Sequence, residues 1–307
     1  MFNLFSFMPK PFNEGWLPER DGHEIYYCQY GNPQGIPVLS FHGGPGGSSK
    51  PKYAKLFNLK KYRFIQFDQR GGGKSKYRDL LNNNTTAYLL DDAKQLLEHL
   101  DIKSPVIVNG ASWGSTMALL FAEAYPEKVS KIVISSVFLA RPYDTDWVDV
   151  ESERFYPDIW AEMRKKINGS DVRKEYTRLL FSERLRDNIK ALTYLGAYEY
   201  MLGQLDPHFE EPEAETLEQN LKPARIAFHY AKHKYFISGN QILRNALKIR
   251  RIPTLIVHNR MDFCCPPKQA WDLHRALPKS ELLILPEYGH SSPEILRVMK
   301  KRLKSFL

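Results

Sequence analysis

A serine in a glycine-flanked turn, Gly110-Ala111-Ser112-Trp113-Gly114, constrains this chain more than any other feature. A β-branched run, 106–108, precedes the turn, and an apolar segment rich in good helix formers, 116–124, follows it. In a strand–turn–helix of this kind the serine adopts a strained conformation, and small flanking residues let strand and helix pass closely. The pattern predicts that the Ser112 hydroxyl lies at the carboxyl end of a strand, beside a helix N-terminus that favours a developing anion. Ser112 is therefore our candidate nucleophile.

Strand and helix patterns alternate on both sides of this turn. Strand-like runs at 37–41, 62–67, 105–109 and 129–137 flank an amphipathic helix at 86–100, and residues 15–30 resemble a hairpin. Such alternation is typical of an α/β fold with a mostly parallel central sheet covered by helices.

The pattern changes after residue 141. Helical stretches at 156–166, 174–185, 188–202 and 217–230, with an acidic loop at 206–215, replace the β-branched strands. Strand and helix patterns resume at 251–258, 268–276, 281–285 and 293–306. We interpret 1–141 and 246–307 as one core and 142–245 as a helical cap inserted into it.

Composition narrows the class of partner. The 307 residues are 43% hydrophobic and 26% charged, which is ordinary for a soluble globular protein with a large core. The net charge of +9 comes from basic residues spread along the chain, with no nucleic-acid motif, so we expect a solvated basic surface and no nucleic-acid partner. No apolar run is long enough to span a membrane, and the short apolar start is not typical of a signal peptide. The composition does not indicate an oligomeric state.

The cysteines indicate a redox compartment. Cys28, Cys264 and Cys265 make an odd count with two adjacent, so no disulfide framework is predicted. A reduced, cytoplasmic location fits this usage.

A second glycine cluster, His42-Gly43-Gly44-Pro45-Gly46-Gly47, follows the strand at 37–41. It lacks the Lys-Ser/Thr pair of a phosphate loop, so we do not expect a nucleotide. Its backbone is suited to donating an N–H to an oxyanion, and we choose Gly44 over Gly43 as that donor. The N–H of Trp113, next after the nucleophile, would be the second donor. We expect His42 to brace this loop and Asp68 to hold the glycine turn at 71–73.

A serine needs a base to take its proton and a carboxylate to orient that base. In hydrolases built on such a sheet the order is Ser, then Asp or Glu, then His, on loops after late strands. Asp262 follows the strand at 251–258, and His290 follows the strand at 281–285. We therefore predict Asp262 as the acid and His290 as the base.

Other histidines are expected to be structural. His229 and His233 lie four apart on a predicted helix, but no acidic or cysteine ligand is spaced to join them. We predict neither a metal nor a cofactor.

Five motifs in order resemble the proline iminopeptidase (prolyl aminopeptidase) family of α/β-hydrolase serine peptidases. They are His42–Gly47, Phe67-Asp-Gln-Arg-Gly-Gly-Gly-Lys-Ser75, Gly110-Ala-Ser-Trp-Gly-Ser-Thr116, His258-Asn-Arg-Met-Asp262 and Gly289-His-Ser291. The resemblance runs from about residue 12 to the C-terminus and is loose only in the cap. It implies a metal-free aminopeptidase that releases an N-terminal residue, preferably proline, from short peptides.

The resemblance also implies substrate-binding residues. Glu199 resembles the family's cap glutamate that binds the free amino group, and Phe138 matches an aromatic residue of the proline pocket. Cys265 matches a cysteine often found near the site. One departure concerns a second cap glutamate, because this chain reads Ala224-Arg-Ile-Ala-Phe228 where that acid is typical. Its absence weakens electrostatic selection for a protonated N-terminus.

Two alternatives stay open from the residues. One is another hydrolase of the same fold, such as an esterase, lactonase or small-amide hydrolase, which the missing glutamate favours. The other is a non-catalytic ligand-binding relative, against which the complete Ser, Asp and His set argues.

Overall fold

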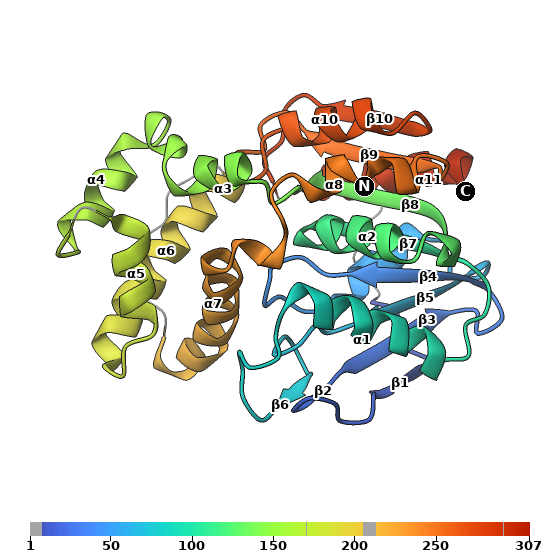
Figure 1. Ribbon diagram of the computed structural model, residues 1–307, viewed down its shortest axis with the longest axis horizontal. Coiled ribbons are helices and arrows are strands. Elements are labelled where there is room, and N and C mark those ends of the chain that lie inside the picture. The colour runs from blue at the N-terminus through green and yellow to red at the C-terminus, as the bar shows by residue number, and fades with distance from the viewer. Residues whose placement is uncertain (1–7, 170, 205–212, 291) are drawn as a thin grey trace.

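The computed structural model describes residues 8–169, 171–204, 213–290 and 292–307. An eight-stranded sheet of order β1-β3-β5-β4-β7-β8-β9-β10 forms its centre, and a group of helices projects from one side of it (Figure 1). β1 and β3 pair antiparallel, as do β3 and β5, and every pair from β5 to β10 is parallel. The predicted fold, an α/β protein with a mostly parallel sheet, is confirmed.

The strands of the large sheet are β1 (Asn13–Trp16), β3 (Tyr26–Gly31), β4 (Ile36–Phe41), β5 (Tyr62–Phe67), β7 (Val106–Ser112), β8 (Val129–Val137), β9 (Thr254–Asn259) and β10 (Ser280–Leu285). β2 (His23–Glu24) and β6 (Lys76–Tyr77) form a separate two-stranded sheet. The core helices are α1 (Thr86–His99), α2 (Trp113–Ala124), α8 (Gln241–Arg244), α9 (Ala246–Ile249), α10 (Lys268–Ala276) and α11 (Pro293–Phe306).

Adjacent side chains along the central strands pack on opposite faces of the sheet. Leu39 and Val108 join a cluster with α1, α2 and α10, whereas their chain neighbours Val38 and Ile107 join a second cluster with α11. Both faces are therefore covered, which explains why these strands read as continuous apolar runs.

Five helices and a third apolar cluster form the projecting part of the described chain. These helices are α3 (Pro142–Asp149), α4 (Pro157–Lys165), α5 (Val172–Leu180), α6 (Leu185–Gln204) and α7 (Leu217–Lys232). Trp160, Tyr176 and Met201 are buried among them. α7 also joins the core, since its Ile226 and Tyr230 belong to the same cluster as Leu39.

The predicted boundary between the helices at 174–185 and 188–202 is wrong, because the break between them comes earlier in the chain. α5 ends at Leu180 and α6 begins at Leu185. The Asn188 side chain donates to the carbonyls of Leu179, Leu180 and Ser182, so the carbonyls at the end of α5 are satisfied without a further turn. The predicted acidic loop at 206–215 lies outside the described residues, apart from 213–215.

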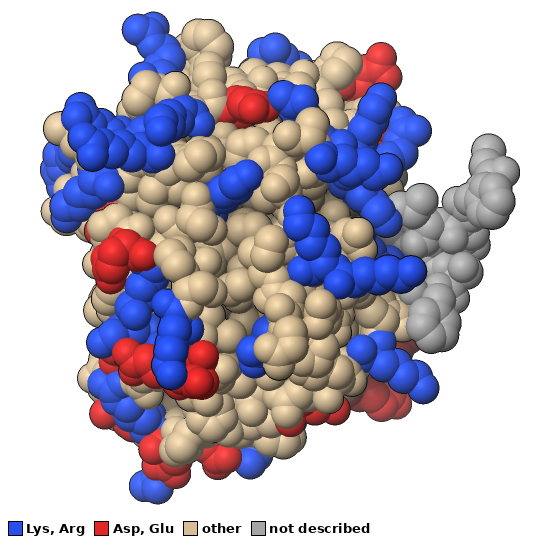
Figure 2. Space-filling view, turned by 90° about the vertical axis from the view of Figure 1, so that its right-hand side faces the viewer, with Lys and Arg blue, Asp and Glu red and all other residues tan. Residues whose placement is uncertain are grey.

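At the C-terminal end of the predicted cap, the chain already packs into the core before residue 246. α8 precedes residue 246, and yet its Ile242 packs in the core cluster beside Ala246 and Ile249. None of the described helices is long and apolar enough to cross a bilayer. The end of the molecule away from the cap carries Lys and Arg in several separate groups, with acidic residues among them (Figure 2).

Candidate active site

The turn around Ser112 has the strained geometry expected of a nucleophile. Ser112 ends β7 with φ 57° and ψ −129°, and α2 begins at the next residue. A Cβ at Gly110 would lie 2.1 Å from the Gly114 carbonyl oxygen, and one at Gly114 would lie 2.3 Å from the Phe41 carbonyl oxygen. Both positions therefore need glycine, because these contacts are with backbone that cannot move aside. Ser112 is held where strand, helix and neighbouring loop meet.

Two loops brace the turn through a buried hydrogen-bond network. The Gln69 N–H donates to His42 Nε2 at 2.9 Å, and the ring's Nδ1 lies 2.7 Å from the Gly43 carbonyl oxygen. His42 must therefore be neutral with its proton on Nδ1, and burial lowers its pKa. The Gln69 side chain in turn accepts from Trp113 Nε1 at 2.8 Å. The network links the loop at 42–47 to the nucleophile turn.

Asp68 holds the glycine turn, as predicted. Its carboxylate accepts from the backbone N–H of Ser49 at 2.6 Å and of Lys74 at 2.8 Å. A Cβ at Gly73 would lie 2.1 Å from that carboxylate, so the turn closes directly on it.

An ion pair beneath this turn was missed by the sequence analysis. Arg70 and Asp92 of α1 are 1% and 3% exposed and pair through two contacts of 2.7 Å. Burial raises the pKa of Asp92, and Arg70 opposes that shift. The pair anchors the loop after β5 to α1.

The loop at 42–47 lies against the candidate nucleophile. A Cβ at Gly43 would lie 3.7 Å from Ser112 Cβ, and Gly44, with φ +135°, lines the cavity above the serine. Trp113 is the first residue of α2, where backbone N–H groups have no partner within the helix. The expected oxyanion donors, Gly44 and Trp113, thus lie on the two backbone segments that flank Ser112.

Asp262 and His290 form a hydrogen-bonded pair. His290 Nδ1 lies 3.0 and 2.9 Å from the two carboxylate oxygens of Asp262, which is itself 2% exposed. The Cys265 N–H donates to the same carboxylate at 2.7 Å, and Asn259 donates to the Gly289 carbonyl oxygen at 2.6 Å. The carboxylate and the loop at 286–290 are therefore both fixed, and His290 Nε2 is left for the reaction.

The surroundings of His290 and of the nearby His258 shift the pKa values of the two rings in opposite directions. Burial lowers the pKa of His290, but the charges of Cys264 and Asp262 outweigh it and raise the pKa above its ordinary value. His258 Nδ1 accepts from the Val137 N–H at 3.0 Å, so its proton lies on Nε2, which donates to the Cys265 carbonyl oxygen. Burial lowers the pKa of His258. His258 is a neutral structural residue.

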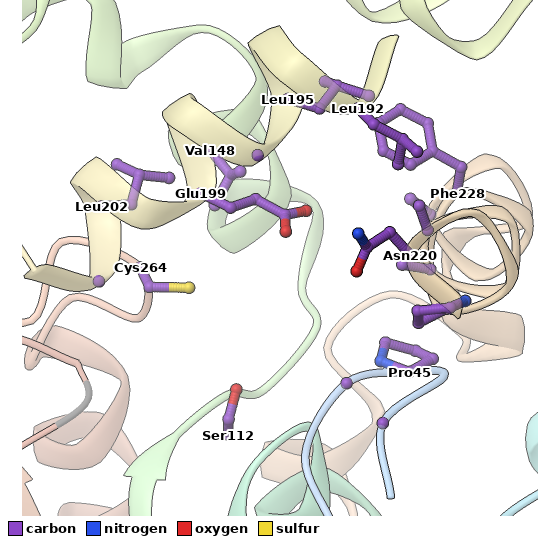
Figure 3. Close-up of a pocket in the computed structure, with 18 of the residues that line it drawn as sticks. Pro45, Ser112, Val148, Leu192, Leu195, Glu199, Leu202, Asn220, Phe228 and Cys264 are labelled. Atoms are coloured by element: carbon purple, nitrogen blue, oxygen red, sulfur yellow. The ribbon is translucent and has the colours of Figure 1, made fainter. Parts of the chain in front are cut away.

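A cavity of about 1330 Å³ lies between the sheet edge and the projecting helices. Ser112 and His290 line its floor, and Glu199 lines it from α6. The Ser112 hydroxyl and the Glu199 carboxylate both point into this space from opposite sides, and Asn220 points into it from α7 (Figure 3). Phe138 also lines the cavity and packs edge-on against Tyr235, with ring centroids 5.0 Å apart.

The cavity wall also holds a cation that the sequence analysis missed. Arg173 of α5 lines it, forms an ion pair with Asp149 and lies 5.0 Å over the Phe228 ring. The Glu199 side chain is exposed to the cavity, where partial removal from bulk water raises its pKa while Arg173 opposes the shift. No local motif marks Arg173, because the contact joins helices distant in sequence.

The cap position at which the family typically has a second glutamate lies in the wall of this cavity. Ala227 and Phe228 line it, so the position where the resemblance implies a second glutamate carries no charge. His229 and His233 lie elsewhere on α7, where His229 Nε2 is 3.1 Å from the Asn84 carbonyl oxygen. Within the described part of the chain, the one cluster of three metal-type ligands is Cys264, Cys265 and His290.

The parallel sheet, the serine turn and the late Asp–His pair define an α/β-hydrolase. The family described as alpha/beta hydrolase fold matches residues 36–294. An alpha/beta fold family hydrolase from Bacillus anthracis superposes with a TM-score of 0.66 over 97% of this chain and 100% of that one, at 15% identity, and so shares the fold.

Similar sequences identify the family within this fold to which the chain belongs. A proline iminopeptidase of Arabidopsis thaliana is 40% identical over 93% of this chain and 77% of its own length. A probable proline iminopeptidase of Leptolyngbya boryana is 37% identical over 92% and 90%. The chain belongs to the proline iminopeptidase family.

Proposed function

We propose that this protein is a serine aminopeptidase that releases an N-terminal residue, preferably proline, from short peptides. The observation that carries the proposal is the cavity lined by Ser112 and His290, into which the cap carboxylate of Glu199 points from the side opposite Ser112 (Figure 3). A carboxylate opposite the nucleophile suits a substrate whose protonated amino group lies one residue from the bond to be cut.

The reaction follows from the positions of three side chains. His290 Nε2 takes the Ser112 proton as Oγ attacks the carbonyl carbon of the first residue. Asp262 orients the ring and stabilises the imidazolium. The C–N bond breaks as His290 returns the proton to the leaving amine, which leaves an acyl-enzyme. Water then attacks the ester with His290 again as base, and the free amino acid leaves.

The tetrahedral intermediate needs donors for its oxyanion. The backbone N–H groups of Gly44 and Trp113 would supply them from the two segments that flank Ser112. A donor of this kind is worth about 3–4 kcal/mol in the transition state.

Substrate choice rests on the cavity walls. Glu199 would hold the protonated amine, and Phe138 would line a small apolar pocket for the proline ring. The cavity, with its volume of about 1330 Å³, has room for a short peptide. The three cysteines are free thiols, which supports a reducing, cytoplasmic compartment.

A panel of proline compounds tests the proposal. We expect the wild type to cleave a proline arylamide and to ignore its N-acetylated form, and Ser112→Ala to lose activity by several orders of magnitude. Glu199→Gln should raise KM for the free-amine substrate, whereas Glu218→Gln, an exposed carboxylate elsewhere in the cap, serves as the matched control.

A second function has one observation in its favour. Ala227 leaves the α7 wall of the cavity without an acid, and the second carboxylate that lines the cavity, Glu213, lies at a different position, so an ester or amide lacking a free amine meets less discrimination at that wall. Equal cleavage of the N-acetylated and free substrates, with Ser112→Ala still inactive, would establish an esterase or small-amide hydrolase instead. Lack of rapid Ser112 labelling by a fluorophosphonate would favour a non-catalytic relative.

A further inference from the structure

Three soft ligand groups converge at the floor of the cavity. The sulfur atoms of Cys264 and Cys265 and a ring nitrogen of His290 all lie within 4.8 Å of one another. All three residues line the cavity, where Cys264 and His290 are half-buried and Cys265 is buried, so an ion that enters the cavity meets Cys264 and His290 first. The Cys264 side chain points into this space (Figure 3). The proposed reaction uses only one of the three, His290, and leaves both thiols without a role.

The donor set suits one class of ion. Two thiolates and an imidazole are ligands of Zn²⁺, which takes sulfur at about 2.3 Å and nitrogen at about 2.0–2.1 Å in a tetrahedron. In such a tetrahedron neighbouring ligand atoms lie less than about 4 Å apart, so small side-chain rotations bring this group to bonding distance. A fourth position would remain open to water from the cavity.

The surroundings of the three residues also fit a metal. Metal-binding histidines donate their second ring N–H to a carboxylate, and His290 Nδ1 already faces Asp262 at 2.9 Å. The two sulfur atoms belong to adjacent residues of the loop after β9, so the chain itself keeps both sulfur donors close to the ring.

We propose that Cys264, Cys265 and His290 form an inhibitory Zn²⁺ site in the active-site cavity. Coordination through Nε2 occupies the lone pair that would accept the Ser112 proton. Zn²⁺ binding therefore releases to solvent the protons held on the two sulfur atoms and any proton on Nε2, and it removes the base at the same time. Removal of the metal by a chelator restores the base, so the inhibition is reversible.

Metal titration of the full-length protein tests the site. Zn²⁺ is titrated against activity, and Co²⁺ against the thiolate-to-cobalt charge-transfer absorption, which needs no turnover. Cys264→Ser is the principal variant because its side chain faces the cavity, and Cys265→Ala is the second. Cys28→Ser removes a thiol from β3, and His233→Ala removes an exposed histidine, so these two variants are the controls.

We expect reversible inhibition of the wild type and, relative to each variant's metal-free rate, at least about a tenfold higher half-inhibitory Zn²⁺ concentration for either cysteine variant. The Co²⁺ thiolate band should persist in Ser112→Ala and weaken in Cys264→Ser. An unchanged Zn²⁺ sensitivity of Cys264→Ser, absence of the band from the wild type, or loss of sensitivity in His233→Ala would overturn the proposal. Because the cobalt band is read without substrate, a wrong assignment of the substrate would not affect it.

Discussion

The chemistry of individual residues here depends on which partner each side chain meets. His42 and His258 are both buried, and each accepts a backbone N–H at one ring nitrogen, which keeps the ring neutral. His290 instead faces a carboxylate with one nitrogen and the cavity with the other. Only the third arrangement leaves a ring nitrogen available as a base. The same residue type therefore serves as brace, as structural partner and as proposed catalyst.

The Arg70–Asp92 pair provides a prediction at the residue scale. Asp92→Asn leaves the buried guanidinium with only the carboxylate of Asp21, 3.9 Å away, so we expect a loss of about 3 kcal/mol in the free energy of unfolding. The adjacent Asp91→Asn breaks an exposed pair with Arg20 and should cost less than about 1 kcal/mol. Urea denaturation of both variants measures the difference. Equal losses of stability in the two variants would show that the buried ion pair stabilises the fold no more than the exposed one.

At the scale of elements, the site depends on how closely a helix, a strand and a loop approach one another. α2 meets the end of β4 at Gly114, and the glycine loop meets Ser112 at Gly43. Any side chain at Gly114 would push α2 away from the loop. The turn is therefore rigid because its neighbours leave no space, and this rigidity preorganises the expected oxyanion donors.

A pair of glycine substitutions tests this packing. Gly114→Ala places a methyl group 2.3 Å from the Phe41 carbonyl oxygen and should lower the free energy of unfolding by about 2–3 kcal/mol. Gly196→Ala, within α6, meets nothing within 4 Å and should raise it by up to about 1 kcal/mol, since alanine favours a helix. Thermal unfolding compares the two. Similar melting temperatures for both variants would contradict the close-approach argument.

At the scale of the whole molecule, the cap and the core are held together by α7 and by the segment after it. Tyr230 of α7 donates to Asn84 of the core at 2.9 Å. Further along, Asn245 donates to Glu123 of α2 at 3.1 Å, where the chain re-enters the core. Burial of this carboxyl raises its pKa to about 7, and the hydrogen bonds from Asn245 and Gln241 oppose that shift only in part.

Glu123 predicts a pH dependence of global stability. Because its pKa is about 7 when folded and 4.5 as the ordinary value, the protonated form favours folding. The contribution is complete below 4.5 and is lost as the pH rises through about 7. The permanently neutral Glu123→Gln should therefore gain stability relative to wild type, by up to about 3 kcal/mol, between pH about 5 and about 8.

Urea denaturation of both proteins across this pH range checks the prediction. Glu127→Gln removes an exposed carboxylate from the adjacent 3₁₀ turn and controls for the loss of one charge. A stability difference between Glu123→Gln and wild type that does not change with pH would disprove the role of this carboxyl.

Short-range sequence patterns determined the backbone around the candidate site. The serine turn, the alternating strands and the bounds of α10 and α11 follow from local glycine constraints, β-branched runs and helix periodicity. The order Ser112, Asp262, His290 placed the three residues at the carboxyl ends of strands in one sheet. The misplaced end of α5 arose because Asn188, in the next helix, satisfies its last carbonyls.

Only the tertiary structure decided what surrounds the serine. Arg173 beside Glu199, the uncharged Ala227 wall and the grouping of two thiols with His290 join segments far apart in the chain. Local propensity carries no information on such contacts, because packing of the cap on the core sets their distances. The serine turn and the order of the motifs thus indicated the chemistry, whereas the charges and ligands above the serine came from three-dimensional packing.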